Sequence, residues 1–208
     1  MEQISMRNEL IRKALHFLLI LVPIGYSLLG KWPSLIIFAI LTSIIAIPDY
    51  LRRTNPKIKT IFAKIFGIIL RPHELAGDKF CGATWVGIAA CLNFLLFKKE
   101  IAVTGFIILV ISDALAAIVG RNYPSRPFFE KSVSGAAAFA VSGFIILISC
   151  GIIFDSRPWF YIFGLFALFC VTMFESRPSF LQVDDNFTIP IGFGVIMTFF
   201  DIIWNYTY

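Results

Sequence analysis

One carboxylate in this sequence lies where its neighbours predict hydrocarbon. Asp113 belongs to the segment Ser112–Gly135, which leaves an apolar run at Arg121, passes a short basic loop and enters a second apolar run after Lys131. A charge at membrane depth costs at least about 2.5–3.5 kcal/mol on insertion scales, so such residues usually face a bundle interior and serve a function. The segment therefore predicts a functional hairpin that carries a carboxylate and a lysine.

Other charged and polar residues lie where apolar runs begin or end, on what we expect to be one side of a membrane. They are Arg12, Lys13, His16, Asp49, Arg52, His73, Glu74, Arg121, Glu175, Asp184, Asp185 and Asn186. Carboxylates and cations together suit a substrate that brings metal and phosphate. Mg²⁺ takes one or two carboxylates plus phosphate oxygens, and Lys or Arg neutralises the remaining charge.

Small and hydroxyl residues of the hairpin fit the same chemistry. Asp113 and Gly120 share one helical face, and Gly135 opens the returning helix, so a second helix or a ligand can approach closely. Ser132 offers a hydroxyl beside the free N–H groups at the start of that helix, which suits phosphate.

Structural interpretations of these residues stay open. Arg12, Lys13 and Arg52 are also consistent with basic residues that only set the membrane orientation and extend their charged ends to the interface. His16 is consistent with an interhelical hydrogen-bond donor. The Asp184–Asn186 segment is consistent with a helix cap, as is Ser132.

The composition predicts an integral membrane protein with a single domain over residues 1–208. Of 208 residues, 58% are hydrophobic and 15% charged, and the mean hydropathy is +0.83, far above a soluble domain. Four cysteines lie in or beside apolar runs without metal-ligand spacing, which indicates small buried residues. Seven apolar runs are candidates to cross roughly 30 Å of hydrocarbon. They are Leu10–Leu29, Pro33–Ile47, Gly82–Phe97, Ile101–Val119, Val133–Phe154, Trp159–Phe174 and Ile189–Trp204.

The basic residues predict the orientation. Fourteen Lys and Arg fall in the N-terminal segment and in alternate loops, against four on the other side. This bias predicts a cytoplasmic N-terminus and site, and an external C-terminus. We attribute the net charge of +5 to the basic loops that set the orientation. The sequence has no basic face interleaved with aromatic residues, which is the pattern that would indicate nucleic-acid binding.

The long loop after the second run contains a further helical pattern. Apolar residues recur at helical spacing with lysines between them: Ile58, Ile61, Phe62, Ile65, Ile68 and Ile69. The pattern predicts an amphipathic helix, either in the membrane interface or packed on the bundle. We therefore expect an all-α, polytopic fold with about seven transmembrane helices plus this interfacial helix.

The motifs resemble those of the CTP-dependent lipid kinases, which include dolichol kinase, phytol kinase and the fungal-type diacylglycerol kinase. The resemblance covers nearly the whole chain, and its last motif is closest in wording to the diacylglycerol kinase branch. Its pieces are Arg12-Lys13-Ala-Leu-His16, Asp49-Tyr-Leu-Arg52, Arg71-Pro-His-Glu74, Gly82-Ala-Thr84, Ser112–Arg121, Lys131–Gly135, Glu175 and Asp184–Pro190. Tyr123-Pro124 and Glu130 stand where many family members have glycine.

The resemblance implies transfer of the γ-phosphate of CTP, with Mg²⁺ or another divalent cation, to the hydroxyl of a membrane lipid alcohol. Diacylglycerol is favoured over a polyprenol, dolichol or phytol. We assign metal contacts to Asp113 and Asp185, supported by Glu175 and Asp184. The groups expected to bind the nucleotide are Arg12, Lys13, Arg121, Lys131, Ser132, Gly135 and Asn186. The general base stays open between His16 and an aspartate.

Two other functions stay open. Phosphatidate cytidylyltransferases share an Asp…Gly…Lys-Ser/Thr…Gly stretch, but Asp184-Asp185-Asn186 occupies the place of their closing signature. A non-enzymatic small transporter or assembly protein is the other alternative. The sequence leaves undecided the oligomeric state and the host membrane, which is a bacterial inner membrane or the endoplasmic reticulum.

Overall fold

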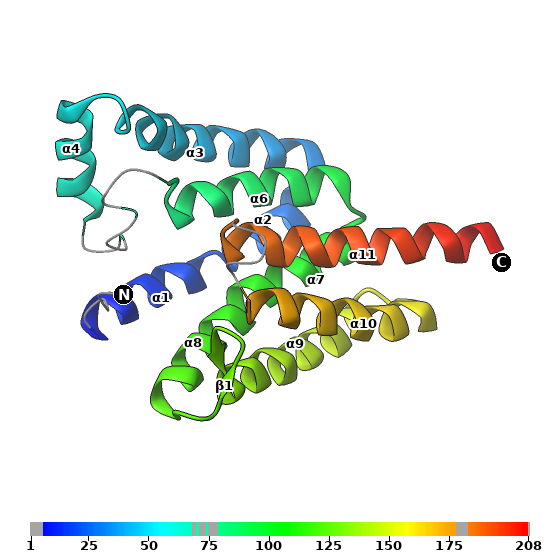
Figure 1. Cartoon of the computed structure of the whole chain (residues 1–208). Helices are drawn as coiled ribbons and strands as arrows, with labels where there is room; N and C mark the ends of the chain where they lie inside the picture. The colour runs from blue at the N-terminus through cyan, green and yellow to red at the C-terminus, as the bar shows by residue number, and fades with distance from the viewer. Residues whose placement is uncertain (1–5, 68–69, 71–73, 75–78, 178–182, 208) are drawn as a thin grey trace.

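The computed structural model describes residues 6–67, 70, 74, 79–177 and 183–207, and this part of the chain is almost wholly α-helical (Figure 1). Its elements are α1 Met6–Leu18, α2 Leu21–Leu29, α3 Lys31–Leu51, α4 Pro56–Phe66, α6 Gly82–Leu96, α7 Lys99–Ile107, the π-helical turn η1 Ile108–Ser112, α8 Asp113–Asn122, β1 Pro127–Phe128, β2 Lys131–Ser132, α9 Val133–Ile153, α10 Pro158–Glu175 and α11 Asp185–Thr207. The all-α membrane fold predicted from the sequence is confirmed, with one small hairpin added by β1 and β2.

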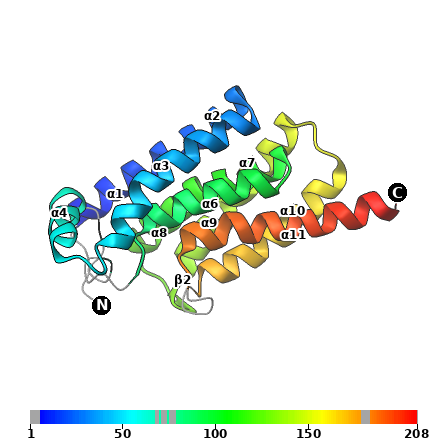
Figure 2. The same ribbon diagram turned by 90° about the horizontal axis from the view of Figure 1, so that it is seen from above.

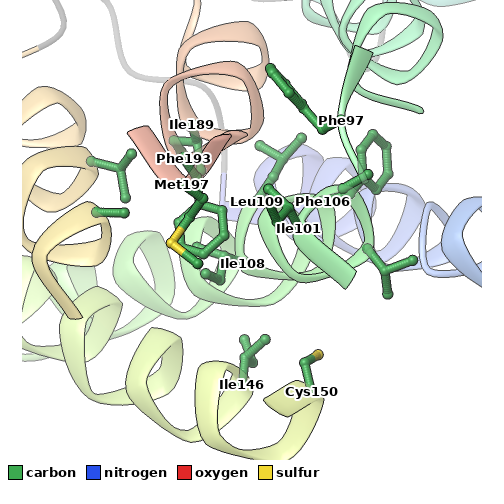
Figure 3. Packing of buried hydrophobic residues seen from close by; sticks show 14 of the residues in the cluster. Phe97, Ile101, Phe106, Ile108, Leu109, Ile146, Cys150, Ile189, Phe193 and Met197 are labelled. Atoms are coloured by element: carbon green, nitrogen blue, oxygen red, sulfur yellow. The ribbon is translucent and has the colours of Figure 1, made fainter. Parts of the chain in front are cut away.

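The segment Lys99–Asn122, made of α7, η1 and α8, is the centre of the bundle. Of its most apolar window, 67% is buried inside the protein, against 17% for each of the two N-terminal spans. Ile101 and Phe106 are fully buried, and Figure 3 shows this segment packed against Phe193 of α11 and Ile146 of α9. The start of α8, where the Asp113 side chain is 15% exposed, is therefore surrounded mainly by protein rather than by lipid.

The remaining helices surround this central segment. Figure 2 shows α6 and α7 between the α2–α3 pair and the α10–α11 pair. The outer faces keep large apolar side chains exposed, such as Ile36 and Ile44 on α3, as expected for surfaces in contact with hydrocarbon.

Six described segments are long and apolar enough to cross a membrane. They are Ile11–Leu29, Lys31–Leu51, Lys99–Asn122, Val133–Ile153, Pro158–Glu175 and Asp185–Asn205. Helix α6 occupies the place of the remaining predicted span, but its 15 residues reach only about 22 Å at 1.5 Å per residue. It is apolar and packs against α3 and α11, so neighbouring helices cover it.

Two element boundaries differ from the predicted ones. Helix α3 continues through Pro48 to Leu51, although a proline in a helix removes one backbone donor. It continues because Asp49, in its last turn, is buried and bonded to the chain before α6. Helix α11 begins at Asp185 rather than at Ile189, since the Asp184 carboxylate accepts the backbone N–H of Asn186 and starts the helix early.

The amphipathic helix predicted in the long loop is present as α4. The Asn55 side chain caps it by accepting the backbone N–H groups of Lys57 and Ile58, and Pro56 opens its first turn. The predicted apolar residues Ile68 and Ile69 lie outside the described residues. Figures 1 and 2 place α4 at the same end of the bundle as α1 and α8, and the C-terminus at the opposite end.

The predicted orientation can be tested because the continuous segment Lys99–Asn122 separates Lys99 from Ser125 by one membrane crossing. In a protein whose native cysteines are replaced and which is expressed in a bacterial inner membrane, we expect a membrane-impermeant maleimide to label Lys99→Cys in intact cells. Ser125→Cys should be labelled only after permeabilisation, because basic loops stay cytoplasmic. Labelling in the reverse pattern would contradict the orientation.

Candidate active site

Asp113 is the first residue of α8, and its carboxylate is paired with a lysine from α1. The Lys13 Nζ lies 2.7 Å from Asp113 Oδ2 and 3.4 Å from the Asp113 backbone oxygen. Both side chains are largely buried, with 6% and 15% exposed for Lys13 and Asp113. The expected charge at membrane depth is therefore compensated by a direct ion pair between the first span and the central segment.

His16 lies one turn after Lys13 and faces the same place. Its Nε2 donates to the Leu109 carbonyl at 3.2 Å and lies 3.8 Å from Asp113 Oδ2. Leu109 belongs to η1, and single π-helical turns inside α-helices recur at functional sites. The π-helical turn thus supplies the acceptor that orients His16 next to Asp113.

Lys131 forms a second ion cluster with carboxylates from two other helices. Its Nζ contacts Glu175 Oε1 and lies 3.1 Å from Asp185 Oδ2. The hairpin turn that precedes Lys131 is fixed to the end of α10, because the Glu130 backbone N–H donates to the Ser176 carbonyl at 3.0 Å. The β1–β2 hairpin therefore delivers one lysine to both Glu175 and Asp185.

Electrostatics keep Lys131 cationic. Burial alone would lower the pKa of Lys131, but the carboxylates of Asp185, Glu175 and Asp113 outweigh burial and raise this pKa above its ordinary value. A raised pKa in the folded state means that the stabilisation is fully present below the unfolded pKa and is lost only at strongly alkaline pH. Because Asp113 contributes, the two ion clusters act on one another.

Asp185 has an oxygen available to a ligand. Its Oδ1 is buried and has no hydrogen-bond partner among the described residues. A buried polar atom without a partner is costly, and in native structures it often marks a ligand, ion or water position. Asp184 is engaged differently, since its Oδ1 accepts both the backbone and the side-chain N–H of Asn186 at 3.0 and 2.6 Å.

A third polar network joins α3 to the start of α6. Arg52 donates to Asp49 Oδ1 and to the Glu74 carbonyl, each at 2.5 Å. The other oxygen of Asp49 accepts the backbone N–H of Cys81 at 2.8 Å and the Thr84 hydroxyl at 2.6 Å. Asp49, Arg52 and Glu74 belong to the sequence motifs but are not among the predicted site residues. The signal was present, because Asp49 and Arg52 are charges at the end of an apolar run.

Glu74 and Gly82 bring this network to Asn186. Glu74 Oε1 accepts the Gly82 backbone N–H at 2.8 Å. A Cβ placed on Gly82 would lie 2.9 Å from Asn186 Nδ2, so glycine allows α6 and α11 to approach here. The motif residues Arg71 and His73 lie outside the described residues.

The predicted phosphate-binding residues of the hairpin serve helix packing and capping in this structure. A Cβ on Gly120 would lie 2.9 Å from Ser132 Oγ, and one on Gly135 would lie 3.1 Å from the Ala116 carbonyl, so both glycines let α8 and α9 pack closely. The Ser132 hydroxyl accepts the Gly135 backbone N–H at 3.2 Å and caps α9. Arg121 is exposed in the last turn of α8. Their role toward a nucleotide stays a prediction.

A cavity of about 440 Å³ is lined by the Asp113 pair and also by Glu74 and Asn186. Its walls are polar at one end and apolar elsewhere. The polar lining residues are Arg12, Lys13, His16, Glu74, Asp113, Asp184, Asp185 and Asn186. The apolar lining residues come mainly from α1 to α4 and α6 and include Leu15, Leu19, Val22, Phe38, Leu41, Ile45, Phe62, Phe66, Val86 and Ala90. Such a cavity suits a molecule with a polar head and a hydrocarbon tail.

The predicted carboxylates do not form one ready-made metal site. Among the described residues, no group of three or more His, Cys, Asp or Glu side chains could hold a metal ion. Asp113 is paired with Lys13, whereas Glu175 and Asp185 share Lys131. Mg²⁺ bound together with phosphate needs only one or two protein carboxylates. The partnerless oxygen of Asp185, in a residue that lines the cavity, fits that requirement.

Comparison with known proteins finds distant relatives along most of the chain. An uncharacterised protein of Rickettsia prowazekii is 29% identical over 200 residues, which cover 92% of this chain and 94% of that protein. CTP-dependent diacylglycerol kinase 1 of Eremothecium gossypii is 25% identical over 173 residues, 72% of this chain and 53% of the kinase. Probable phytol kinase 1, chloroplastic, of Glycine max is 29% identical over 129 residues, 53% of this chain and 41% of that protein.

The chain spans about half, or less, of the length of these two kinases. No family model matches the chain. No solved structure matches it either. The distant homologues of this chain nevertheless include CTP-dependent diacylglycerol kinases and a probable phytol kinase, which supports the resemblance that its motifs predicted.

Proposed function

We propose that this protein is a CTP-dependent lipid kinase that transfers the γ-phosphate of CTP to the hydroxyl of a membrane lipid alcohol. Diacylglycerol is the favoured acceptor, ahead of a polyprenol, dolichol or phytol. The observation that carries the proposal is the cavity, whose apolar walls end at Lys13, Asp113 and Asp185. The names of the distant relatives support the same reaction class.

The cavity is open toward the bilayer between α1 and α3. Leu15 and Leu41 line the cavity, and they are also 45% and 54% exposed on the outer surface. A lipid alcohol in the leaflet can therefore place its tail between these helices without leaving hydrocarbon. Its hydroxyl then reaches the polar end, where Asp113 and Asp185 lie.

The nucleotide is expected at the same end, where Arg12 and Lys13 line the cavity and Lys131 contacts the lining residue Asp185. Arg121, exposed in the last turn of α8, stays a predicted phosphate contact. In the present structure Lys13 and Lys131 are neutralised by carboxylates. The phosphates of an incoming nucleotide would compete with these carboxylates for the two lysines. Lys131 would contribute to nucleotide binding in this way. We place this end, with the N-terminus, on the cytoplasmic side because it carries most of the basic loops.

The reaction needs positioning and charge compensation more than covalent chemistry. The acceptor hydroxyl oxygen attacks the γ-phosphorus, the bond from that phosphorus to the bridging oxygen breaks, and CDP leaves. The hydroxyl proton passes to an aspartate or to His16, both of which line the cavity. A divalent cation held by Asp113 and Asp185 would offset phosphate charge, with Glu175 and Asp184 as supporting carboxylates.

The fate of each phosphate tests the proposal. Purified protein and Mg²⁺ are offered three alcohols in separate reactions: diacylglycerol, a polyprenol such as dolichol, and phytol. Label from γ-labelled CTP should appear in the lipid product of at least one of them. Label from α-labelled CTP should remain in CDP, because only the terminal phosphate moves. Thin-layer separation of lipid and nucleotide products measures both.

Two other outcomes would overturn the kinase proposal. With phosphatidate as acceptor, α-label in the lipid together with release of pyrophosphate would indicate a cytidylyltransferase. Absence of lipid label from either position, with all three alcohols and phosphatidate, would indicate a non-enzymatic membrane protein.

Asp113 can be tested by a substitution that keeps its shape. Asp113→Asn should lower kcat by about 10²-fold or more, because it removes a charge aimed at the reacting groups. The variant should still insert because an amide fits the same space, but it leaves Lys13 buried without its ion-pair partner. The melting temperature is therefore measured beside kcat, and kcat is compared at a temperature where both proteins are folded. Asp155→Asn, near the opposite end between α9 and α10, is the matched control and should keep wild-type turnover. Near-normal turnover of Asp113→Asn would show that Asp113 is structural.

A further inference from the structure

Helix α4 presents a basic and apolar face away from the bundle. Lys57, Ile61, Lys64 and Ile65 follow helical spacing and share one face. Ile61 and Ile65 are 58% and 64% exposed, and both lysines are exposed. The helix contains three lysines and no acidic residue, so its outer face is cationic as well as apolar.

The direction of α4 suits a membrane surface. Figure 1 shows α4 running across the end of α3, whereas α3 and the other long helices run along the bundle. With the long helices crossing the bilayer, α4 lies near the plane of the headgroups. Isoleucines at the acyl boundary with lysines reaching the headgroups are the usual arrangement of an interfacial helix.

The opposite face of α4 forms part of the cavity wall. Phe62 is buried against Leu70 and Cys81, and both Phe62 and Phe66 line the cavity. The Arg52 guanidinium lies 4.8 Å from the centre of the Phe62 ring. The position of α4 therefore determines one wall of the cavity and contacts the network that reaches Glu74.

We propose that α4 binds anionic phospholipid through Lys57 and Lys64, and that this contact holds the Phe62 wall in place and raises turnover. The charge of the face selects the partner, because cationic segments at a membrane surface are attracted by anionic lipids. The effect on turnover rests on the proposed kinase function. The binding of anionic lipid by α4 does not.

The test compares a charge-removing pair with a charge-keeping pair of substitutions in full-length, reconstituted protein. We measure kcat in phosphatidylcholine vesicles and in vesicles with equal parts phosphatidylcholine and phosphatidylglycerol. Wild type and Lys57→Arg/Lys64→Arg should be several-fold faster with phosphatidylglycerol, whereas Lys57→Gln/Lys64→Gln should show little response. Each lysine removed should weaken the affinity of α4 for anionic lipid by roughly fivefold. Added salt should reduce the increase in wild-type kcat that phosphatidylglycerol causes.

A second readout is independent of activity. A nitroxide on Thr60→Cys, in a protein whose native cysteines are replaced by alanine, reports the mobility of α4. Phosphatidylglycerol should reduce this mobility in the wild-type and arginine backgrounds but not in the glutamine background. A glutamine variant that responds like wild type, in either measurement, would overturn the proposal. If no vesicle supports phosphoryl transfer, the proposed function fails and the nitroxide result alone decides whether α4 binds anionic lipid.

Discussion

The buried ion pair between Lys13 and Asp113 is the contact on which the rest of the site depends. Removing one partner of such a pair typically costs about 3–5 kcal/mol, because the other charge stays buried. The helix contacts of α1 are chiefly with η1 and α8, at this pair. Helix α3 lies across the cavity from α1. The ion pair thus anchors α1 to the central segment while the cavity stays open between α1 and α3.

The two lysines of the site are both held by carboxylates in the protein as it stands. Lys13 faces Asp113, and Lys131 faces Glu175 and Asp185. This arrangement compensates the charges where they are buried. Under the proposed function, the lysines would exchange these carboxylates for the phosphates of the nucleotide. The carboxylates would then be available for a divalent cation, which is consistent with the partnerless oxygen of Asp185.

Hydrophobic runs and charges at their ends predicted the helices and most residues near the cavity. The sequence could not predict which carboxylate each lysine of the site contacts. The Lys13–Asp113 contact lies beside the π-helical turn Ile108–Ser112, and nothing in that apolar run distinguishes a π-turn from an ordinary helix. The approach of Lys131 to Glu175 depends on a turn in which Phe129 has a φ of 54°, where glycine would have been the recognisable signal. The extension of α3 past Pro48 was missed because burial of Asp49 overrides the local effect of proline.

Under the proposed function, the lipid alcohol binds in the cavity lined by α1 and α3. A second apolar groove between α9 and α10, which includes Val133 and Phe169, is the alternative binding place. A diacylglycerol with a photoactivatable group in one chain can be crosslinked in reconstituted protein and mapped by mass spectrometry. We expect crosslinks at cavity residues such as Leu15 and Leu41, and we expect excess unlabelled diacylglycerol to suppress them. Competable crosslinks confined to the α9–α10 groove would contradict the claim.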